Sequence, residues 1–325
     1  MADNQRAAQF QDESRGAAMT INCYGDENNW HLQLKGILSL NGKDYTLEPK
    51  SRDRRETPRD QEEYIAEEEP VTPVGDDYVE PPPEEYIPPP SRPFLQSRQM
   101  PVYTIDVLAV IDYSIYQRHF NRTDSGLSAA ERRLLALQDI REYFAYIMNG
   151  VNLRYKTITG MGSSLVISLS SFVVVETAAA STWTEDNVTM TSSGGEVNAL
   201  TVLEALRDWV GSSNLPSNDH VMLFTKYDLY TVSGGTKSNN VIGYAYVGTM
   251  CRPAGYSTSV IEDLGRFLRI NVAAHELGHS LGAKHDGTNN NTCSADDHYI
   301  MAAVSSTRYA NSWHFSSAQS TTSTT

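Results

Sequence analysis

Three histidines and one glutamate lie close together near the C-terminal end of the sequence, at spacings that suit a metal ion. His275 and His279 are four residues apart, so on a helix they share one face with Cβ atoms about 5–6 Å apart. Both imidazoles can then reach one zinc ion at the ~2.0–2.1 Å of a Zn–N bond. Glu276 points about 100° round the helix. It cannot easily be a ligand there, but it can take a proton from water beside the metal.

A third histidine follows a glycine that can end the helix. Gly282 can adopt the positive φ that lets the chain turn sharply, which brings His285 back towards the first two histidines. Three histidines leave the fourth coordination position open, which indicates one catalytic zinc ion rather than a structural one. Two surface histidines on a helix are common, but the longer pattern with its context is specific.

The whole pattern, H-E-x-x-H-x-x-G-x-x-H, is followed sixteen residues later by Met301. A single methionine is by default a core residue, but in this context it resembles the methionine turn of the metzincin proteases. Asp286, directly after the third histidine, resembles the reprolysin (adamalysin) branch. That branch holds ADAM and ADAMTS proteases, snake-venom metalloproteases and arthropod salivary enzymes. The resemblance also covers residues 103–112, 219–225 and 247–251.

The resemblance implies both a fold and an activity. The implied fold is the α/β metzincin metalloprotease fold, a twisted mixed sheet with packed helices, a zinc helix and a small irregular C-terminal subdomain with a Met-turn. The implied activity is that of a secreted zinc metalloendopeptidase (EC 3.4.24 type) acting on extracellular proteins or peptides, with Glu276 as general base. Met301 would lie beneath the histidines, and Asp286 would brace the following loop. A calcium ion near Asp106 and Asp219 is a weaker implication.

The pattern of apolar residues predicts the elements that position this site. The expected strands are residues 102–111, 153–158, 164–175, 219–225 and 241–246. A capping box at Ser128 predicts a helix to about residue 149, and residues 195–210 predict a second helix. We expect an extended substrate to lie along residues 244–250. The other histidines, His31, His119, His220, His298 and His314, lack ligand spacing.

The N-terminal third divides into two further segments. Residues 1–55 resemble a partial prodomain and contain a hairpin signal, Asn41-Gly42. Residues 56–99 are acidic and rich in proline and tyrosine, and we expect a disordered, solvated linker. Residues 100–325 form the predicted protease domain, which could be truncated at its C-terminal end. Residues 52–55 match a basic convertase site. A charged surface loop explains the same residues equally well.

Charge is concentrated in this linker. The formal net charge is −14, and residues 60–91 hold eleven Asp and Glu with no Lys or Arg, which leaves −3 for the rest. This excludes a basic nucleic-acid surface, and no apolar run is long enough for a membrane span. The acidic tyrosines within residues 60–91 resemble ligands of a basic exosite, although a plain solvated spacer is the favoured explanation.

The compartment follows from the resemblance rather than from the N-terminus. Met1 is not followed by the apolar segment of a signal peptide, so we expect an incomplete N-terminus on a secreted zymogen; a cytosolic protein is the alternative. Three sequons, at Asn121, Asn187 and Asn290, agree with a secreted glycoprotein.

The three cysteines leave pairing and latency open. Cys251 and Cys293 could pair or both be thiols. Cys23 precedes the hairpin and lacks the surroundings of the cysteine switch that silences zinc in related prodomains. A rival function is a degenerate protease that binds partners through residues 56–99, but no expected catalytic residue is missing.

Overall fold

The central sheet carries the elements that hold the candidate site. The computed structural model describes residues 6–12, 17–26, 29–40, 43–49, 64–68, 72–73, 77–83, 101–158, 163–265, 269–288, 293–305 and 310–317. The sheet has the strand order β7-β15-β16-β12-β8-β9. Its strands are β7 (Tyr78–Val79), β15 (Gly243–Tyr246), β16 (Thr258–Glu262), β12 (His220–Thr225), β8 (Val102–Ile111) and β9 (Ser164–Val174). The β15–β16 pair is antiparallel and the other pairs are parallel, which confirms the predicted twisted mixed sheet.

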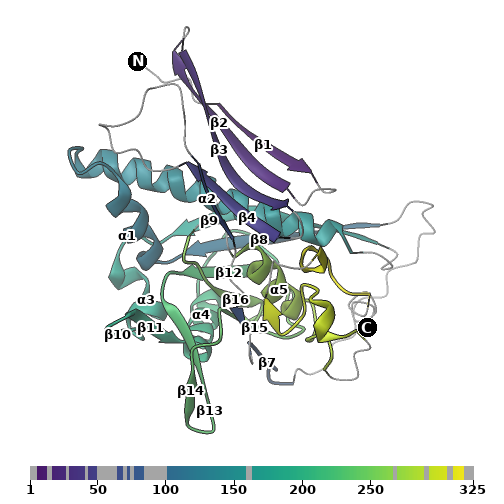
Figure 1. The fold of residues 1–325 in the computed structure, drawn as a ribbon. Helices are drawn as coiled ribbons and strands as arrows, with labels where there is room; N and C mark the ends of the chain where they lie inside the picture. The colour runs from purple at the N-terminus through teal and green to yellow at the C-terminus, as the bar shows by residue number, and fades with distance from the viewer. Residues whose placement is uncertain are drawn as a thin grey trace.

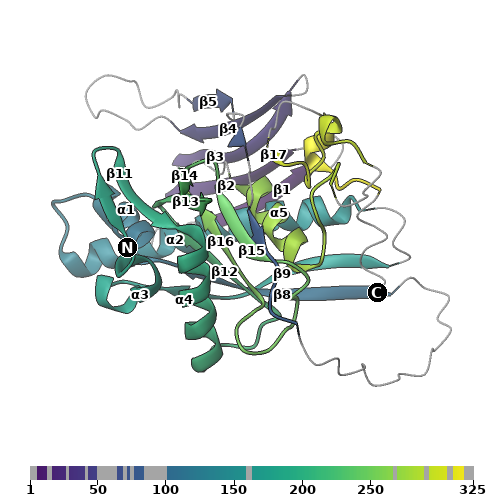
Figure 2. The same cartoon turned by 90° about the horizontal axis from the view of Figure 1, so that it is seen from below.

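Helices cover both faces of this sheet (Figures 1 and 2). On one face lie α1 (Tyr113–Arg122), α2 (Ala129–Lys156) and α5 (Ile270–Ser280); on the other lie the short α3 (Thr182–Glu185) and α4 (Ala199–Ser212). The alternation along β8 explains this division. Val107 and Ala109 belong to the core under α2 and α5, whereas Leu108 and Val110 pack with α4, because successive side chains of a strand point to opposite faces.

Helix α2 begins as predicted but is longer. The Ser128 hydroxyl accepts a hydrogen bond from the Glu131 amide, and the Glu131 side chain accepts one from the Ser128 amide. The strand predicted at residues 153–158 is wrong, because the helix continues to Lys156. Arg154 explains the extension: its guanidinium stacks 3.6 Å from the Trp313 ring centroid and donates to Asn271. None of the helices in the described ranges has both the length and the apolar character that crossing a membrane requires.

Helix α4 begins four residues later than predicted. Asn198 is its N-cap, with its side chain accepting from the Thr201 amide. The preceding residues form β11 (Gly194–Asn198), a strand of a second sheet that the sequence did not predict. Its other strands are β10 (Thr189–Thr191), β13 (Asp228–Ser233) and β14 (Thr236–Ser238).

The N-terminal part forms a separate sheet. Its strands, in spatial order, are β1 (Arg6–Asp12), β2 (Ala17–Asp26), β3 (Asn29–Leu40), β4 (Lys43–Pro49) and β5 (Tyr64–Glu68). The predicted β3–β4 hairpin is confirmed by the pairing of Leu40 with Lys43, while its turn residues lie outside the described ones. Helix α2 runs between this sheet and the central sheet (Figure 1), and Lys35 lies 3.8 Å from Asp139 of α2.

The predicted linker is partly folded. β5 pairs with β4, β6 (Thr72–Pro73) pairs with β17 (Val304–Ser305), and β7 pairs with β15. These residues are therefore paired in sheets rather than disordered, and Asp77 is fully buried. Where one domain ends and the next begins stays a prediction. The irregular C-terminal part has only two 3₁₀ turns, at Ala295–Asp297 and Ala310–Trp313, besides β17 within the described residues.

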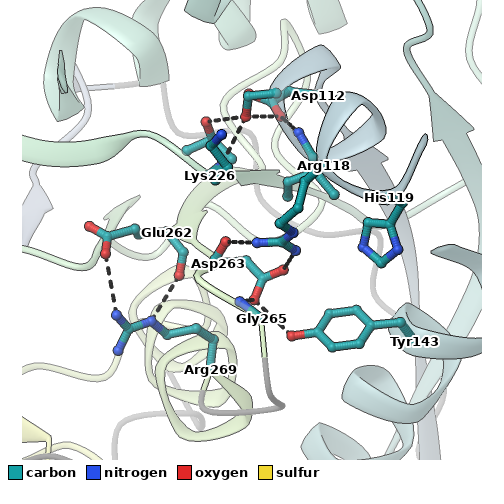
Figure 3. Close-up of polar contacts among 12 residues, drawn as sticks. Asp112, Arg118, His119, Tyr143, Lys226, Glu262, Asp263, Gly265 and Arg269 are labelled. Carbon is teal, nitrogen blue, oxygen red and sulfur yellow. Dashed lines mark hydrogen bonds and ion pairs between the residues drawn. The ribbon is translucent and has the colours of Figure 1, made fainter. Parts of the chain in front are cut away.

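A buried polar network anchors the chain between β16 and α5 (Figure 3). Arg118 of α1 donates to the Asp263 carbonyl at 2.6 Å and pairs with the Asp263 carboxylate at 2.7 Å. The same carboxylate accepts from the Tyr143 hydroxyl at 2.8 Å. Arg269, the N-cap of α5, donates to the Glu262 carbonyl and pairs with the Glu262 side chain. The start of α5 is thus tied to the end of β16.

Candidate metal centre

Helix α5 presents two of the histidines and the glutamate. Its apolar residues Val272, Ala273, Ala274 and Leu277 pack into the core with α2, so the helix is buried on all sides. Gly278 permits close contact with the chain beneath, since a Cβ atom there would lie 2.7 Å from Sδ of Met301. A buried helix fixes the histidine positions more firmly than a surface helix would.

The turn after α5 brings in the third histidine. Gly282 has φ +96°, a left-handed conformation that favours glycine, as predicted. Its amide donates to the His279 carbonyl, and the Ala283 amide donates to the Gly278 carbonyl. These bonds satisfy carbonyls at the helix end and direct His285 back towards α5.

The three imidazoles converge through their Nε2 atoms. The His275 Nε2 atom lies 3.0 Å from that of His279 and 3.2 Å from that of His285. All three rings are buried. The Asp77 carboxylate completes the cluster: its oxygens lie 3.1 Å from Nε2 of His275, 3.2 Å from that of His279 and 2.9 Å from that of His285.

The other ring nitrogens face backbone carbonyls. Nδ1 of His275 lies 2.6 Å from the Ile300 carbonyl oxygen, and Nδ1 of His279 lies 2.8 Å from that of Ala283. A carbonyl only accepts, so both Nδ1 atoms carry a proton, and in the neutral imidazole Nε2 then presents a lone pair to the centre. This is the arrangement by which outer groups orient metal-binding histidines.

A divalent metal ion fits this donor set. Ligands at ~2.0–2.1 Å in a tetrahedral zinc site lie about 3.4 Å apart, close to the observed separations of 2.9–3.2 Å. Neither oxygen of the buried Asp77 has a directed hydrogen-bond donor among the described residues, and such groups are otherwise costly. His275, His279, His285 and Asp77 form the only group with metal-site geometry in the described parts of the chain.

Ionisation in the cluster follows from burial and charge. Burial lowers the pKa of His279 to about 4, so its imidazole is in the neutral form that binds metals. Burial opposes ionisation of Asp77, but the charge of a protonated His275 and hydrogen bonds to the imidazoles hold its pKa well below the usual range. Asp77 in turn raises the pKa of His275 against the effect of burial. Burial, together with the charge of Asp77, raises the pKa of Glu276 well above its usual value.

Glu276 lies against the central sheet. Its carboxyl group is fully buried and its oxygens have no hydrogen-bond partner among the described residues. A Cβ atom on Gly243 would lie 2.2 Å from its Oε1 atom, so the absence of a side chain on β15 makes room for it. A buried carboxyl of raised pKa beside a metal site is suited to accept and return a proton.

The two supporting residues predicted from the sequence also lie at the site. Met301 is fully buried in the core cluster that includes Leu277 and Phe315. The Asp286 amide donates to the Met301 carbonyl, and its carboxylate accepts from the Ser316 hydroxyl at 2.7 Å. Asp286 therefore ties the third-histidine loop to the methionine turn.

Asp77 is the residue at the site that the sequence did not single out. It lies in a run of similar acidic tyrosine motifs, at residues 62–65, 76–79 and 84–87, and nothing local distinguishes it from the others. Only its docking beside β15 reveals it. Tyr78 adds to this docking, with its ring centroid 4.7 Å from that of His279 and 5.4 Å from that of His285.

Other predicted residues lie away from the site. Cys251 and Cys293 form no disulfide with each other: the Cys251 thiol lies 3.6 Å from Asp219 and that of Cys293 lies 3.8 Å from Ser317. The Asp219 carboxylate accepts from the Asp106 amide at 2.8 Å, and nothing there supports calcium, which stays a prediction. His119 faces Asp139, and His220 lies between two serines. The side chain of Cys23 lies outside the described ones.

The model of Metallo-peptidase family M12 matches residues 102–316, well over half of the chain. The chain belongs to this family. Its M12 domain thus has the reprolysin type of metzincin fold, and the matched residues include every member of the cluster except Asp77.

Curated relatives agree with the M12 assignment. The chain is 30% identical over 243 residues to a "disintegrin and metalloproteinase with thrombospondin motifs like" protein of Bombyx mori, which covers 69% of this chain and 32% of that protein. It is 35% identical over 136 residues to "A disintegrin and metalloproteinase with thrombospondin motifs 1" of Rattus norvegicus, covering 39% and 13%. A "zinc metalloproteinase-disintegrin-like" protein of Cerberus rynchops is 29% identical over 157 residues, covering 47% and 21%. The chain thus spans a third or less of these relatives.

Among solved structures, the archaemetzincin of Methanopyrus kandleri matches with 17% identity and a TM-score of 0.36, covering 70% of this chain and 95% of that one. The family match and the named relatives support a zinc-dependent metalloprotease.

Proposed function

We propose that the chain is a secreted zinc metalloendopeptidase of EC 3.4.24 type that hydrolyses peptide bonds in extracellular proteins or peptides. The observation that carries the proposal is the convergence of three imidazole Nε2 atoms. Two of these imidazoles come from a buried helix that also carries Glu276. His275, His279 and His285 would hold one zinc ion.

The residues of the chain have distinct parts in the proposed reaction. Zinc, when bound, makes water acidic and polarises a carbonyl. Glu276 accepts the proton of the water that attacks the scissile carbonyl and then donates it to the leaving amine. A raised pKa makes the Glu276 carboxylate a stronger base towards that water. Met301 and Asp286 hold the histidines and their loop in place and do not touch the substrate.

The proposed substrate is an extended peptide. β15 carries Gly243, the residue against which Glu276 packs, and an extended segment can add to a strand at a sheet edge through main-chain hydrogen bonds. A peptide on β15 would therefore pass beside the catalytic glutamate. The composition argues against nucleic acid as a partner.

The extracellular location rests on the relatives and on the sequons rather than on a direct observation. Mass spectrometry of the natural secreted protein would test it, because glycan mass at Asn187 marks passage through the secretory pathway. Recovery of the unmodified protein only from the cytosol would contradict it.

A binding protein that works through residues 56–99 gains no support. Asp77 and Tyr78 of that segment face the histidines rather than solvent, and the expected catalytic residues are all present.

The direct test replaces the general base. Glu276→Ala should keep stoichiometric zinc and lose about 10²–10⁴-fold in casein hydrolysis, the usual contribution of a positioned acid–base group. Because Asp77 lies among the histidines, the comparison is made in the parent chain and in Asp77→Ala. Unchanged chelator-sensitive turnover in both backgrounds would remove Glu276 from the mechanism.

A further inference from the structure

We propose that Asp77 is a fourth protein ligand of the metal and that residues 77–83 are a built-in inhibitor of the proposed active site. The inference rests on the proposed function and concerns its regulation. The chain as described would then be a latent form in which both the open metal position and the edge of β15 are occupied.

The position of the Asp77 carboxylate among the three histidines supports its role as a ligand. Asp77 is fully buried, and its oxygens lie 2.9–3.2 Å from the Nε2 atoms of all three histidines. Three histidines alone leave one position of a tetrahedral zinc site open, and this carboxylate lies where it would fill that position. No other carboxylate or thiol joins the cluster in the described residues.

The negative charge of the buried Asp77 carboxylate also favours a bound cation. A buried aspartate without a directed hydrogen-bond donor is costly unless a cation compensates it. Two of the facing imidazoles have Nδ1 protons held by carbonyls, so in the neutral form that binds metals they face Asp77 with lone pairs. A divalent cation between these groups turns a repulsive arrangement into an attractive one.

The strand next to Asp77 supports the inhibitory role, because it pairs with β15. β7 pairs in parallel with β15, and the amides of Ala245 and Val247 donate to the carbonyls of Asp77 and Val79 at 3.0 and 3.1 Å. β15 would otherwise be the edge of the sheet. The main-chain groups that an extended substrate needs are therefore already used by residues 77–79.

Contacts upstream and downstream of Asp77 also hold the segment in place. Glu80 pairs with Lys284, the residue before the third histidine, at 2.5 Å. Arg252 donates to the Pro82 carbonyl at 2.8 Å, and upstream β6 pairs with β17, beyond the methionine turn. A carboxylate rather than a peptide carbonyl faces the histidines, so the segment lies against β15 as an inhibitor and not as a substrate.

A consequence concerns proteolytic activation. A cut in the basic sequence at residues 52–55 would leave Asp77 joined to the protease domain. Activation requires release of residues 77–83, and hence a cut between residue 83 and β8 at Val102. The site of the activating cut is thus placed downstream of the sequence that most resembles a convertase site.

The first experiment reports on the metal ligand without using activity. Co²⁺ is loaded into the intact parent chain, Asp77→Ala and Asp77→Asn, with Asp76→Asn as a control of equal charge change. The visible spectrum of Co²⁺ responds to the number and type of its ligands. We expect both Asp77 variants to differ from the parent and from Asp76→Asn. Four identical spectra would overturn the assignment of Asp77.

The second readout uses acetohydroxamate, a small chelator that needs an open metal position. Its apparent affinity for the loaded chain falls in proportion to the fraction of open sites, so Asp77→Ala should bind it at least about tenfold more tightly than the parent. Equal affinity would show that Asp77 does not block the metal.

The third readout separates this inference from the proposed function. A site for a specific protease is placed in the intact chain either within residues 52–55 or within residues 84–100. We expect casein hydrolysis to rise at least about tenfold only after the second cut and dilution. Equal hydrolysis before and after it would overturn latency and leave the peptidase proposal standing. A changed Co²⁺ spectrum with no hydrolysis in any form would confirm the ligand and contradict the peptidase.

Discussion

Gly243 and Glu276 are packed so closely that β15 tolerates no side chain at this point. A Cβ atom on Gly243 would lie 2.2 Å from Oε1 and 2.6 Å from Cδ of Glu276. Strand β15 and Glu276 therefore fix each other, and the glycine acts on the proposed reaction only through the position of that carboxyl group.

Gly243→Ala should displace the Glu276 carboxyl group. A shift of about 1 Å at a reacting group can lower turnover about 10²-fold, so we expect a lower kcat with a nearly unchanged KM and full zinc content. Gly126→Ala, in an exposed loop, serves as the control. Loss of zinc together with activity would indicate general unfolding instead of a positioning role.

Met301 and Gly278 form a second close pair, with the sulfur 2.7 Å from the position of a Cβ on Gly278. Met301→Ala leaves a cavity and should lower the free energy of unfolding by about 2–5 kcal/mol. Gly278→Ala overpacks the same place and should cost about 1–3 kcal/mol. The double variant should be more stable than the sum predicts, by about 0.5–3 kcal/mol. Additive losses in urea unfolding would show that the two residues do not share this contact.

Arg118 neutralises the buried Asp263 between β16 and α5. Arg118→Ala leaves that charge without its partner, and we expect a loss of about 3–5 kcal/mol in the free energy of unfolding. Arg133→Ala is the matched control, since Arg133 is about half exposed in its pair with Glu176 and such pairs contribute about 0–1 kcal/mol. Similar losses in both variants would contradict the anchoring role of the Arg118–Asp263 pair.

His220 should make the fold sensitive to acid. Burial lowers its pKa to about 3, against about 6.5 in the unfolded chain. The unfolded state therefore takes up a proton first as the pH falls, and the stability contributed by the neutral imidazole, present above pH 6.5, is lost below it. Between pH 6.5 and 4 the loss should be about 3 kcal/mol. Urea titrations of the parent and His220→Gln measure it as a difference; parallel curves would contradict it.

Local sequence was sufficient for the residues of the proposed site. The spacing of His275, Glu276 and His279 fixes their geometry on any helix, and Gly282 has the positive φ that its position after the helix predicts. The long strand β8 and the start of α2 at Ser128 follow from similarly local signals.

Long-range contacts explain what local pattern did not predict. Residues 153–158 alternate like a strand, but Arg154 is held by Asn271 and Trp313 from distant parts of the chain, and the helix continues. Asp77 lies in an acidic motif that occurs three times with little variation, and only the free edge of β15 selects it. Neither partner is visible in the neighbouring sequence.

The central claim is that three imidazoles hold one metal ion, and calorimetric titration of Zn²⁺ into the metal-free chain tests it most directly. We expect one ion per chain for the parent and for Glu276→Ala. His285→Ala should bind at least about tenfold more weakly, whereas His314→Ala, outside the cluster, should match the parent. A folded parent chain that takes up no stoichiometric zinc, or a His285→Ala variant that binds it as tightly as the parent, would contradict the account.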